Sequence, residues 1–147
     1  MTRRLARIAL ATAVTAGLYA SALAADIGQI KVSRGEVNIE RAGATLPGTV
    51  GLRLQAADIL RTGANGSAGI TMNDDSLLSA GPNSVLVLEH YALDPATSQG
   101  RFDAALNKGT LVVVSGRIAK QAPDAMTVRT PTAVLGARGT EFAVSVD

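Results

Sequence analysis

Apolar and polar positions alternate along most of the chain. The alternation is regular in residues 36–40, 67–72 and 141–147, whereas two short runs rich in valine and leucine, residues 85–88 and 111–114, are apolar throughout. Successive side chains of a strand point to opposite faces, so the alternating segments predict strands with one buried face. The two apolar runs predict strands buried on both faces, because they are short and rich in β-branched residues.

Clusters of Gly, Pro, Asn and Asp separate these segments at short intervals. Such residues favour turns, since glycine allows positive φ and proline fixes φ. Many short strands between frequent turns predict an all-β fold, a single domain with the form of a two-sheet sandwich, a barrel or a solenoid-like stack. Residues 52–57 and 102–106 are helical candidates, each long enough for one turn. The predicted turns are residues 33–35, 46–48, 62–66, 73–75, 81–83, 108–109 and 130–131.

Residues 1–24 have the composition of a signal peptide. Three arginines at the start precede an apolar stretch, residues 8–23, which ends in the small-residue sequence Ala22-Leu23-Ala24. A membrane-spanning helix needs ~20 apolar residues, and this stretch is shorter and interrupted by Thr, Gly and Ser, so an uncleaved anchor is the minor alternative. The sequence therefore predicts cleavage after Ala24 and a periplasmic or secreted protein. The mature domain, residues 25–147, is expected to have no transmembrane segment.

Removal of the signal peptide changes the charge of the protein. The whole chain has 14 Lys and Arg against 12 Asp and Glu, a formal charge of +2, whereas residues 25–147 have 11 against 12, a formal charge of −1. The remaining basic residues are scattered, and aromatic residues make up only 3% of the chain. Nucleic-acid binding is therefore not expected, because it needs a basic patch and aromatic side chains that stack on bases. The chain has no cysteine, so no disulfide contributes to its stability.

Residues suited to catalysis or metal binding are few. The nucleophile patterns G-x-S-x-G and S-x-x-K do not occur, and His90 is the single histidine. We therefore expect no catalytic residues, no cofactor and no enzyme activity, with a hydrolase that uses His90 as a low-ranked alternative. Asn73-Asp74-Asp75-Ser76 is rich in oxygen atoms but lacks the spacing of an EF-hand loop. A hairpin turn is the preferred interpretation of this segment, and a calcium site is the alternative.

The segment Gly136-Ala137-Arg138-Gly139-Thr140 has the glycines and the cation of a ligand-binding loop. A phosphate-binding loop needs G-x-x-x-x-G-K-[ST] before a helix, but here the lysine is absent and a strand pattern follows. The glycines instead predict a tight bend or bulge before a final strand in which Phe142 faces the core. We expect Arg138 to pair with a carboxylate such as Glu141, or with backbone carbonyl groups.

The order of these turns and strands resembles the FecR domain family of exported bacterial envelope proteins. The resemblance extends from about Ile27 to Val146 and is most specific near its end. Asp75 departs from the family, which often has glycine after the preceding aspartate. The segments that carry the resemblance are residues 35–37, 41–43, 57–63, 68–72, 76–84, 108–110, 130–133 and 138–144, and its signature residues are Gly136, Arg138, Gly139, Thr140 and Phe142.

The resemblance implies an all-β domain in the periplasm or at the cell surface. In the best-known members, this domain follows a cytoplasmic anti-sigma region and a transmembrane helix, and relays a signal from an outer-membrane iron-siderophore receptor. Here the expected signal peptide stands in place of both parts, and the family brings no catalytic residues. We therefore expect an interaction or signalling module that binds an envelope protein through strand edges and loops. A glycan- or cell-wall-binding module, with Tyr91 among its few aromatic contacts, is the alternative.

Overall fold

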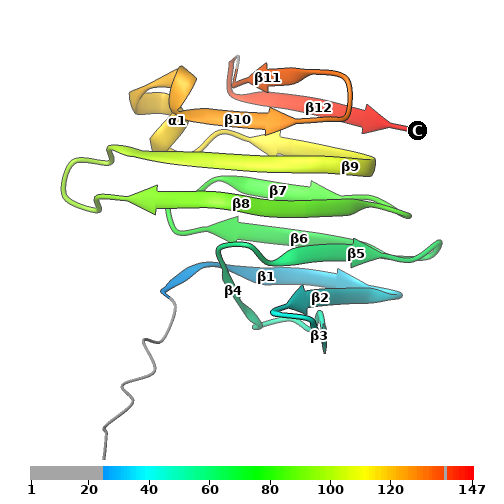
Figure 1. The fold of residues 1–147 in the computed structure, drawn as a ribbon. Helices are drawn as coiled ribbons and strands as arrows, with labels where there is room; N and C mark the ends of the chain where they lie inside the picture. Colours follow the sequence, from blue (N-terminus) through cyan, green and yellow to red (C-terminus); the bar gives the residue numbers. More distant parts are fainter. Residues whose placement is uncertain (1–24, 138) are drawn as a thin grey trace, which may run out of the picture.

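The computed structural model describes residues 25–137 and 139–147, and most of them lie in β-strands (Figure 1). The predicted signal peptide, residues 1–24, and Arg138 lie outside the described residues. The prediction of an all-β fold is confirmed. The strands are β1 (Asp26–Arg34), β2 (Val37–Arg41), β3 (Ala44–Pro47), β4 (Arg53–Gln55), β5 (Ile59–Thr62), β6 (Ser67–Met72), β7 (Leu77–Ala80), β8 (Val85–Leu93), β9 (Gly100–Val114), β10 (Met126–Arg129), β11 (Val134–Gly136) and β12 (Glu141–Val146).

Within the described residues, helical structure occurs between β9 and β10. α1 (Arg117–Gln121) leads into one 3-10 turn, η1 (Pro123–Ala125). The helical turns predicted in residues 52–57 and 102–106 are wrong, because the first segment contains β4 and the second lies inside β9. Strand pairing determines the conformation of both segments, since a helix of one turn has little stability of its own.

The strands form one 12-stranded sheet that curls so that its two arms face each other. The first arm has the order β4-β1-β6-β7-β9-β12, and the second arm has the order β3-β2-β5-β8-β9-β10-β11. Neighbouring strands are antiparallel except β9 and β10, which are parallel. The fold is thus a curled open sheet in place of the two separate sheets of a sandwich. In Figure 1, β2, β3 and β4 lie at one end of the stack, and β11 and β12 lie at the other.

β9 belongs to both arms because it bends near its middle. Its first part pairs with β8 and β10, and its last part pairs with β7 and β12. Gly109 lies at this bend with a φ of +92°, and a Cβ atom there would collide with Ser84. Both conditions require glycine. The turn predicted at residues 108–109 is therefore a bend inside one 15-residue strand.

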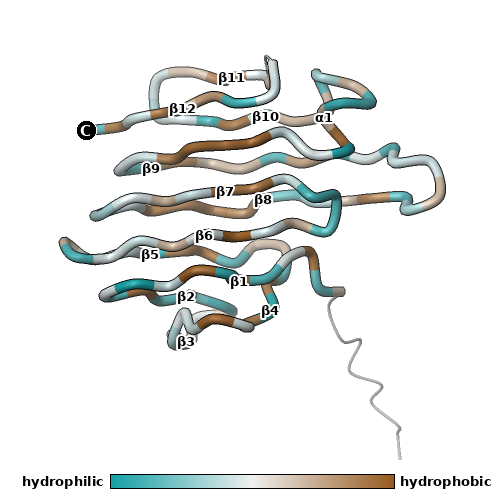
Figure 2. The backbone as a smooth tube through the Cα atoms, turned by 180° about the vertical axis from the view of Figure 1, so that it is seen from behind, coloured by the Kyte–Doolittle hydropathy of each residue, from teal (hydrophilic) through white to brown (hydrophobic). Residues whose placement is uncertain are grey.

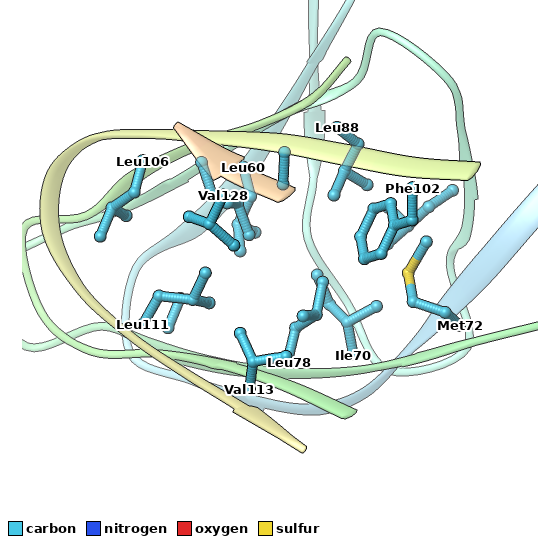
Figure 3. Packing of buried hydrophobic residues seen from close by; sticks show 14 of the residues in the cluster. Leu60, Ile70, Met72, Leu78, Leu88, Phe102, Leu106, Leu111, Val113 and Val128 are labelled. Carbon is cyan, nitrogen blue, oxygen red and sulfur yellow. The ribbon is translucent and has the colours of Figure 1, made fainter. Parts of the chain in front are cut away.

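Buried apolar side chains from the two arms meet in one core (Figure 3). Leu88 and Phe102 of the second arm lie across from Ile70 and Leu78 of the first. Phe102 has no exposed surface, and it is the largest of the fully buried side chains. Because the described residues contain no cysteine, burial in this core and pairing between strands stabilise the sheet.

Each arm has an inner face toward the core and an outer face toward solvent. Figure 2 shows apolar stretches along the strands and hydrophilic residues at many of the turns between them. In the apolar run 85–88, Leu86 and Leu88 are buried whereas Val85 and Val87 are partly exposed, and residues 111–114 alternate in the same way. The prediction that both faces of these runs are buried is wrong, because no second layer covers the outer face among the described residues.

Candidate interaction site at the open end of the sheet

The end of the sheet formed by β11 and β12 has strand edges that remain accessible, and we call it the open end. Within the described residues, β11 pairs only with β10, and β12 pairs only with β9. The two strands end opposite arms, so their outer edges lie at the same end of the molecule (Figure 1). An accessible strand edge presents N–H and C=O groups that can pair with another chain.

The free backbone groups of β12 follow from its pairing with β9. Ser115 N donates to Thr140 O at 2.7 Å, next to the first residue pair of the ladder. Bonded and non-bonded pairs alternate in an antiparallel ladder, so the even-numbered residues of β12 bond to β9. The N–H and C=O groups of Ala143 and Ser145 therefore point along the free edge.

An apolar groove lies between the edges of β11 and β12. Its volume is about 390 Å³, and it is lined by Val134, Leu135, Gly136, Phe142 and Ala143. Val134 and Leu135 are 67% and 37% exposed, whereas Phe142 is partly buried against the edge of the core. The open end thus combines free backbone groups with apolar surface, which is the combination that strand addition uses.

At the opposite end, which we call the closed end, one arginine joins the two arms. Arg41 donates from Nε to Asp58 Oδ1 at 2.9 Å and from Nη2 to Asp58 Oδ2 at 2.7 Å. Its Nη2 also donates to the backbone oxygen of Arg53 in β4 at 2.9 Å. Asp58 is buried, and the hydrogen bonds to its carboxylate raise the pKa of Arg41. This side chain therefore occupies a backbone acceptor of β4 that would otherwise be open to another strand.

Short strands and a proline further block the closed end. β3 has four residues and ends at Pro47, which has no N–H to donate. β4 has three residues, and the segment before it bonds to β1 through Gly51 N to Ile30 O at 2.9 Å and Ile30 N to Leu52 O at 3.0 Å. Short edge strands and proline are common means of preventing edge-to-edge association.

The structure places the signature residues Gly136, Gly139, Thr140 and Phe142 at the open end. Gly136 ends β11, Gly139 has a φ of +74°, and Thr140 accepts the hydrogen bond from Ser115. The predicted bend therefore connects β11 of one arm to β12 of the other. Phe142 faces the core as predicted but is partly exposed. The expected pairing of Arg138 lies outside the described residues.

Other residues of the open end were not identified from the sequence. Val134 and Leu135 resemble core residues in composition, and the outward N–H of Ser145 depends on the register with β9. The sequence signal for this end of the sheet was the pair Gly136 and Gly139, because two nearby glycines indicated a bend before the last strand. That signal locates the bend but does not indicate which strand edge stays unpaired.

The oxygen-rich segment at residues 73–76 is the hairpin between β6 and β7, as its preferred interpretation predicted. The Asp74 carboxylate accepts four hydrogen bonds: Oδ2 from Ser76 Oγ at 2.9 Å and Ile118 N at 3.1 Å, and Oδ1 from Ser76 N at 3.2 Å and Tyr91 OH at 3.3 Å. These donors occupy the lone pairs that a calcium ion would need. Among the described residues, no group of three or more His, Asp and Glu is placed to hold a metal ion.

The residues of the two alternative functions lie away from the open end. Tyr91 is turned inward. Its ring packs edge to face against the ring of Phe102, with the ring centroids 5.3 Å apart. Burial together with the charge of Asp74 raises the pKa of the Tyr91 phenol. It therefore offers little surface to a glycan. His90 is exposed on β8, with Nδ1 3.6 Å from Asp103 Oδ2. The pocket around His90 contains no serine among its described lining residues, so His90 has no serine there to activate as a hydrolase nucleophile.

No helix in residues 25–137 or 139–147 is long and apolar enough to cross a membrane. A family model described as FecR protein matches residues 58–147, which is more than half of the chain. The match begins before β5 and includes the open end, whereas the resemblance seen in the sequence began near Ile27. Comparisons with curated proteins and with solved structures found no match.

Proposed function

Since the chain belongs to the FecR protein family, we propose that it is an exported, non-enzymatic module of the cell envelope that binds a partner protein by strand addition at the open end. The family is linked to signalling and regulation in the envelope. Within that role, this chain would supply the recognition step. The free edge of β12 is the observation that carries the proposal.

The edge of β12 is preferred over that of β11 because it is longer. β12 has six residues and β11 has three, so a strand added to β12 gains about twice as many backbone hydrogen bonds. The added strand would extend the first arm and lay alternate side chains into the groove beside Phe142. Backbone hydrogen bonds would supply affinity, and the groove would supply specificity.

The side chains of β12 also indicate the chemistry of the partner strand. Phe142, Val144 and Val146 face inward, whereas Glu141 and Asp147 are exposed on the outer side. The matching partner strand would alternate apolar residues with lysine or arginine. Its apolar side chains would be buried in the groove, and its basic side chains would lie beside the carboxylates of Glu141 and Asp147. Opposite charges across neighbouring strands are favourable by about 0.2–1 kcal/mol each.

A second copy of the chain is a poorer occupant of this edge. In the antiparallel pair of β12 strands that overlaps residues 141–147 completely, which is centred on Val144, Glu141 of each copy would face Asp147 of the other, and like charges in that position are destabilising. Head-to-tail stacking would require the closed end to accept β12, but Arg41 and Pro47 block it. We therefore commit to a different protein as partner.

The test is photo-crosslinking in intact cells, with a benzophenone amino acid at position 143 on the edge or at position 50 at the closed end. Val50 is a suitable control because it is 62% exposed. We expect position 143 to crosslink to one envelope protein and position 50 not to. Each crosslink is then repeated with Ser145→Pro, which removes an outward N–H, and with Ser145→Ala, which keeps it.

Strand addition requires that Ser145→Pro abolish the crosslink and that Ser145→Ala retain it. Equal yields in the two variants would exclude pairing through the backbone of β12. Equal crosslinking yields at positions 50 and 143 would exclude the open end as the site. A crosslink between two copies of the chain would mean that the occupant of the edge is a second copy and not a different protein. Export is tested separately: the mature protein in the envelope fraction is expected to begin at Ala25, and an intact residue 1 there would contradict cleavage.

A further inference from the structure

The outer face of the second arm has a pocket of about 600 Å³ that strand addition does not use. Its polar lining consists of Glu89 and His90 from β8, Arg101 and Asp103 from β9, and Arg129 from β10. These side chains come from three strands that are adjacent in the sheet. The pocket is therefore assembled by the fold and not by one loop.

A β-bulge in β8 brings two of these side chains to the same place. The register with β9 shifts between Leu88 and His90, so Glu89 is an extra residue without its own partner. A bulge of this kind re-aims the side chains beside it and often occurs next to a functional site. Here Glu89 and His90, the two residues at the bulge, both line the pocket.

Asp103 forms the floor of the pocket. Its side chain is 8% exposed, accepting hydrogen bonds from Thr127 Oγ1 at 2.6 Å and Arg101 Nε at 2.5 Å. Burial alone would raise the pKa of Asp103, but the hydrogen bonds from Thr127 and Arg101 outweigh burial and lower it. The carboxylate is therefore ionised at neutral pH and holds the Arg101 guanidinium in a fixed direction.

The acidic and basic groups of the pocket differ in exposure. The side chains of Arg101 and Arg129 are 69% and 57% exposed, and that of His90 is 75% exposed. Asp103 lies beneath Arg101, and Glu89, which pairs with Arg129, is 21% exposed. Arg101 binds its carboxylate through Nε and Arg129 through Nη2, which leaves the other guanidinium N–H groups free of these two pairs. A molecule that enters the pocket would meet hydrogen-bond donors first.

We propose that this pocket binds an oxyanion, a carboxylate or phosphate group, through Arg101 and Arg129, with Asp103 and Glu89 as positioning residues. Guanidinium groups suit such ligands because their N–H groups match the spacing of two oxygen atoms. The paired carboxylates also reduce the net charge, so the pocket selects by hydrogen-bond geometry more than by charge. Millimolar affinity for a simple anion is the expected range.

The test is a nuclear magnetic resonance titration of the purified protein with sodium phosphate and, in a second arm, with sodium acetate, at constant pH and ionic strength. We expect saturable shifts of the Arg101 and Arg129 Nε–H signals, with a Kd of about 1–10 mM for one of the anions, equivalent to roughly 3–4 kcal/mol. The preferred anion identifies the ligand class. Arg61 is the control signal, since it lies in the same arm, is 48% exposed and is also paired with a carboxylate, that of Glu40.

Three variants separate a built site from a diffuse basic patch. Arg101→Gln is expected to weaken binding about tenfold, whereas Arg61→Gln should leave it unchanged. Glu89→Gln removes a negative charge, yet it should also weaken binding about threefold, because Arg129 loses the group that positions it. Tighter binding by Glu89→Gln would overturn the positioning role. Shifts that fail to saturate at 100 mM, or equal shifts at Arg61, would mean non-specific ion binding and overturn the site.

Discussion

At the closed end of the sheet, Arg41 spans both arms and hydrogen-bonds to a buried carboxylate and to a backbone oxygen of β4. At the open end, the edge of β12 presents backbone groups, and Val134 and Leu135 are exposed beside it. Both ends face the same difficulty, because the last strand of any open sheet has unpaired groups. At the closed end, an ion pair to a buried carboxylate, short strands and a proline block these groups. At the open end, the edge of the six-residue strand β12 stays accessible.

This difference is the reason for placing the proposed recognition at the open end. An accessible, apolar strand edge favours aggregation, and proteins commonly block such edges. The closed end demonstrates that this fold can block an edge with a few residues. The accessible edge of β12 therefore supports the proposal that a partner binds there.

The largest effect is expected at the closed end, from Arg41→Ala. This change leaves the buried Asp58 carboxylate with Gln55 N as its remaining donor. Loss of one member of a buried ion pair costs about 3–5 kcal/mol, and the lower part of that range is expected because Arg41 is 26% exposed. Arg61→Ala is the matched control, because its pair with Glu40 is largely exposed and should contribute no more than about 1 kcal/mol. Urea unfolding curves of the two variants measure both values. Equal losses would mean that Arg41 is merely a surface residue.

At the open end, Phe142→Ala is expected to reduce the free energy of unfolding by about 1–3 kcal/mol. Because Phe102 is fully buried, Phe102→Ala should reduce the free energy of unfolding by about 3–5 kcal/mol. The loss for Phe142→Ala should be smaller because Phe142 is partly exposed. The same unfolding experiment compares them. A loss for Phe142 as large as that for Phe102 would show that the open end is covered in solution.

The bend between β11 and β12 contains two glycines that differ in backbone conformation. Gly139 has a φ of +74°, so Gly139→Ala is expected to cost about 1–2 kcal/mol through backbone strain. Gly136 has no positive φ and no atom within 4 Å of a new Cβ, so Gly136→Ala should change stability by less than about 1 kcal/mol. Thermal unfolding of both variants tests this order, and the reverse order would contradict the bend described above.

The smallest effect on stability is expected from charges on exposed valines. Val134→Lys and Val50→Lys should each alter the free energy of unfolding by no more than about 0.5 kcal/mol, since both side chains are more than 60% exposed. Their effect on binding should differ: Val134→Lys is expected to reduce partner capture at position 143, and Val50→Lys is not. If both variants reduce capture equally, the two ends are not functionally distinct.

Local structure could be predicted from the sequence where it depends on neighbouring residues. The alternation in residues 67–72 gave the bounds of β6, and the pattern in residues 141–147 gave β12. Segments rich in Gly, Asn and Asp correctly marked turns such as residues 62–66 and the hairpin at Asp74. These features follow from side-chain periodicity and turn preferences, which act over a few residues.

The distinction between the two ends could not be predicted in this way. Arg41 and Asp58 are 17 residues apart, and their contact depends on how β2, β4 and β5 are arranged. The free edge of β12 depends on its register with β9, which a sequence of alternating residues does not fix. The run at residues 108–109 looked like an ordinary turn because a glycine at positive φ serves equally in a turn and in a bent strand.

The bend of β9 at Gly109 also has a consequence for the order of folding. β7 and β8 both require β9 as a neighbour, so neither arm can be completed until residues 100–114 have been synthesised and bent. Most of these pairings join distant parts of the chain, and such contacts form slowly. The two arms should then fold and unfold together as one cooperative unit, with β9 as their common nucleus. The earlier strands, although synthesised first, would remain incomplete until this one strand arrives.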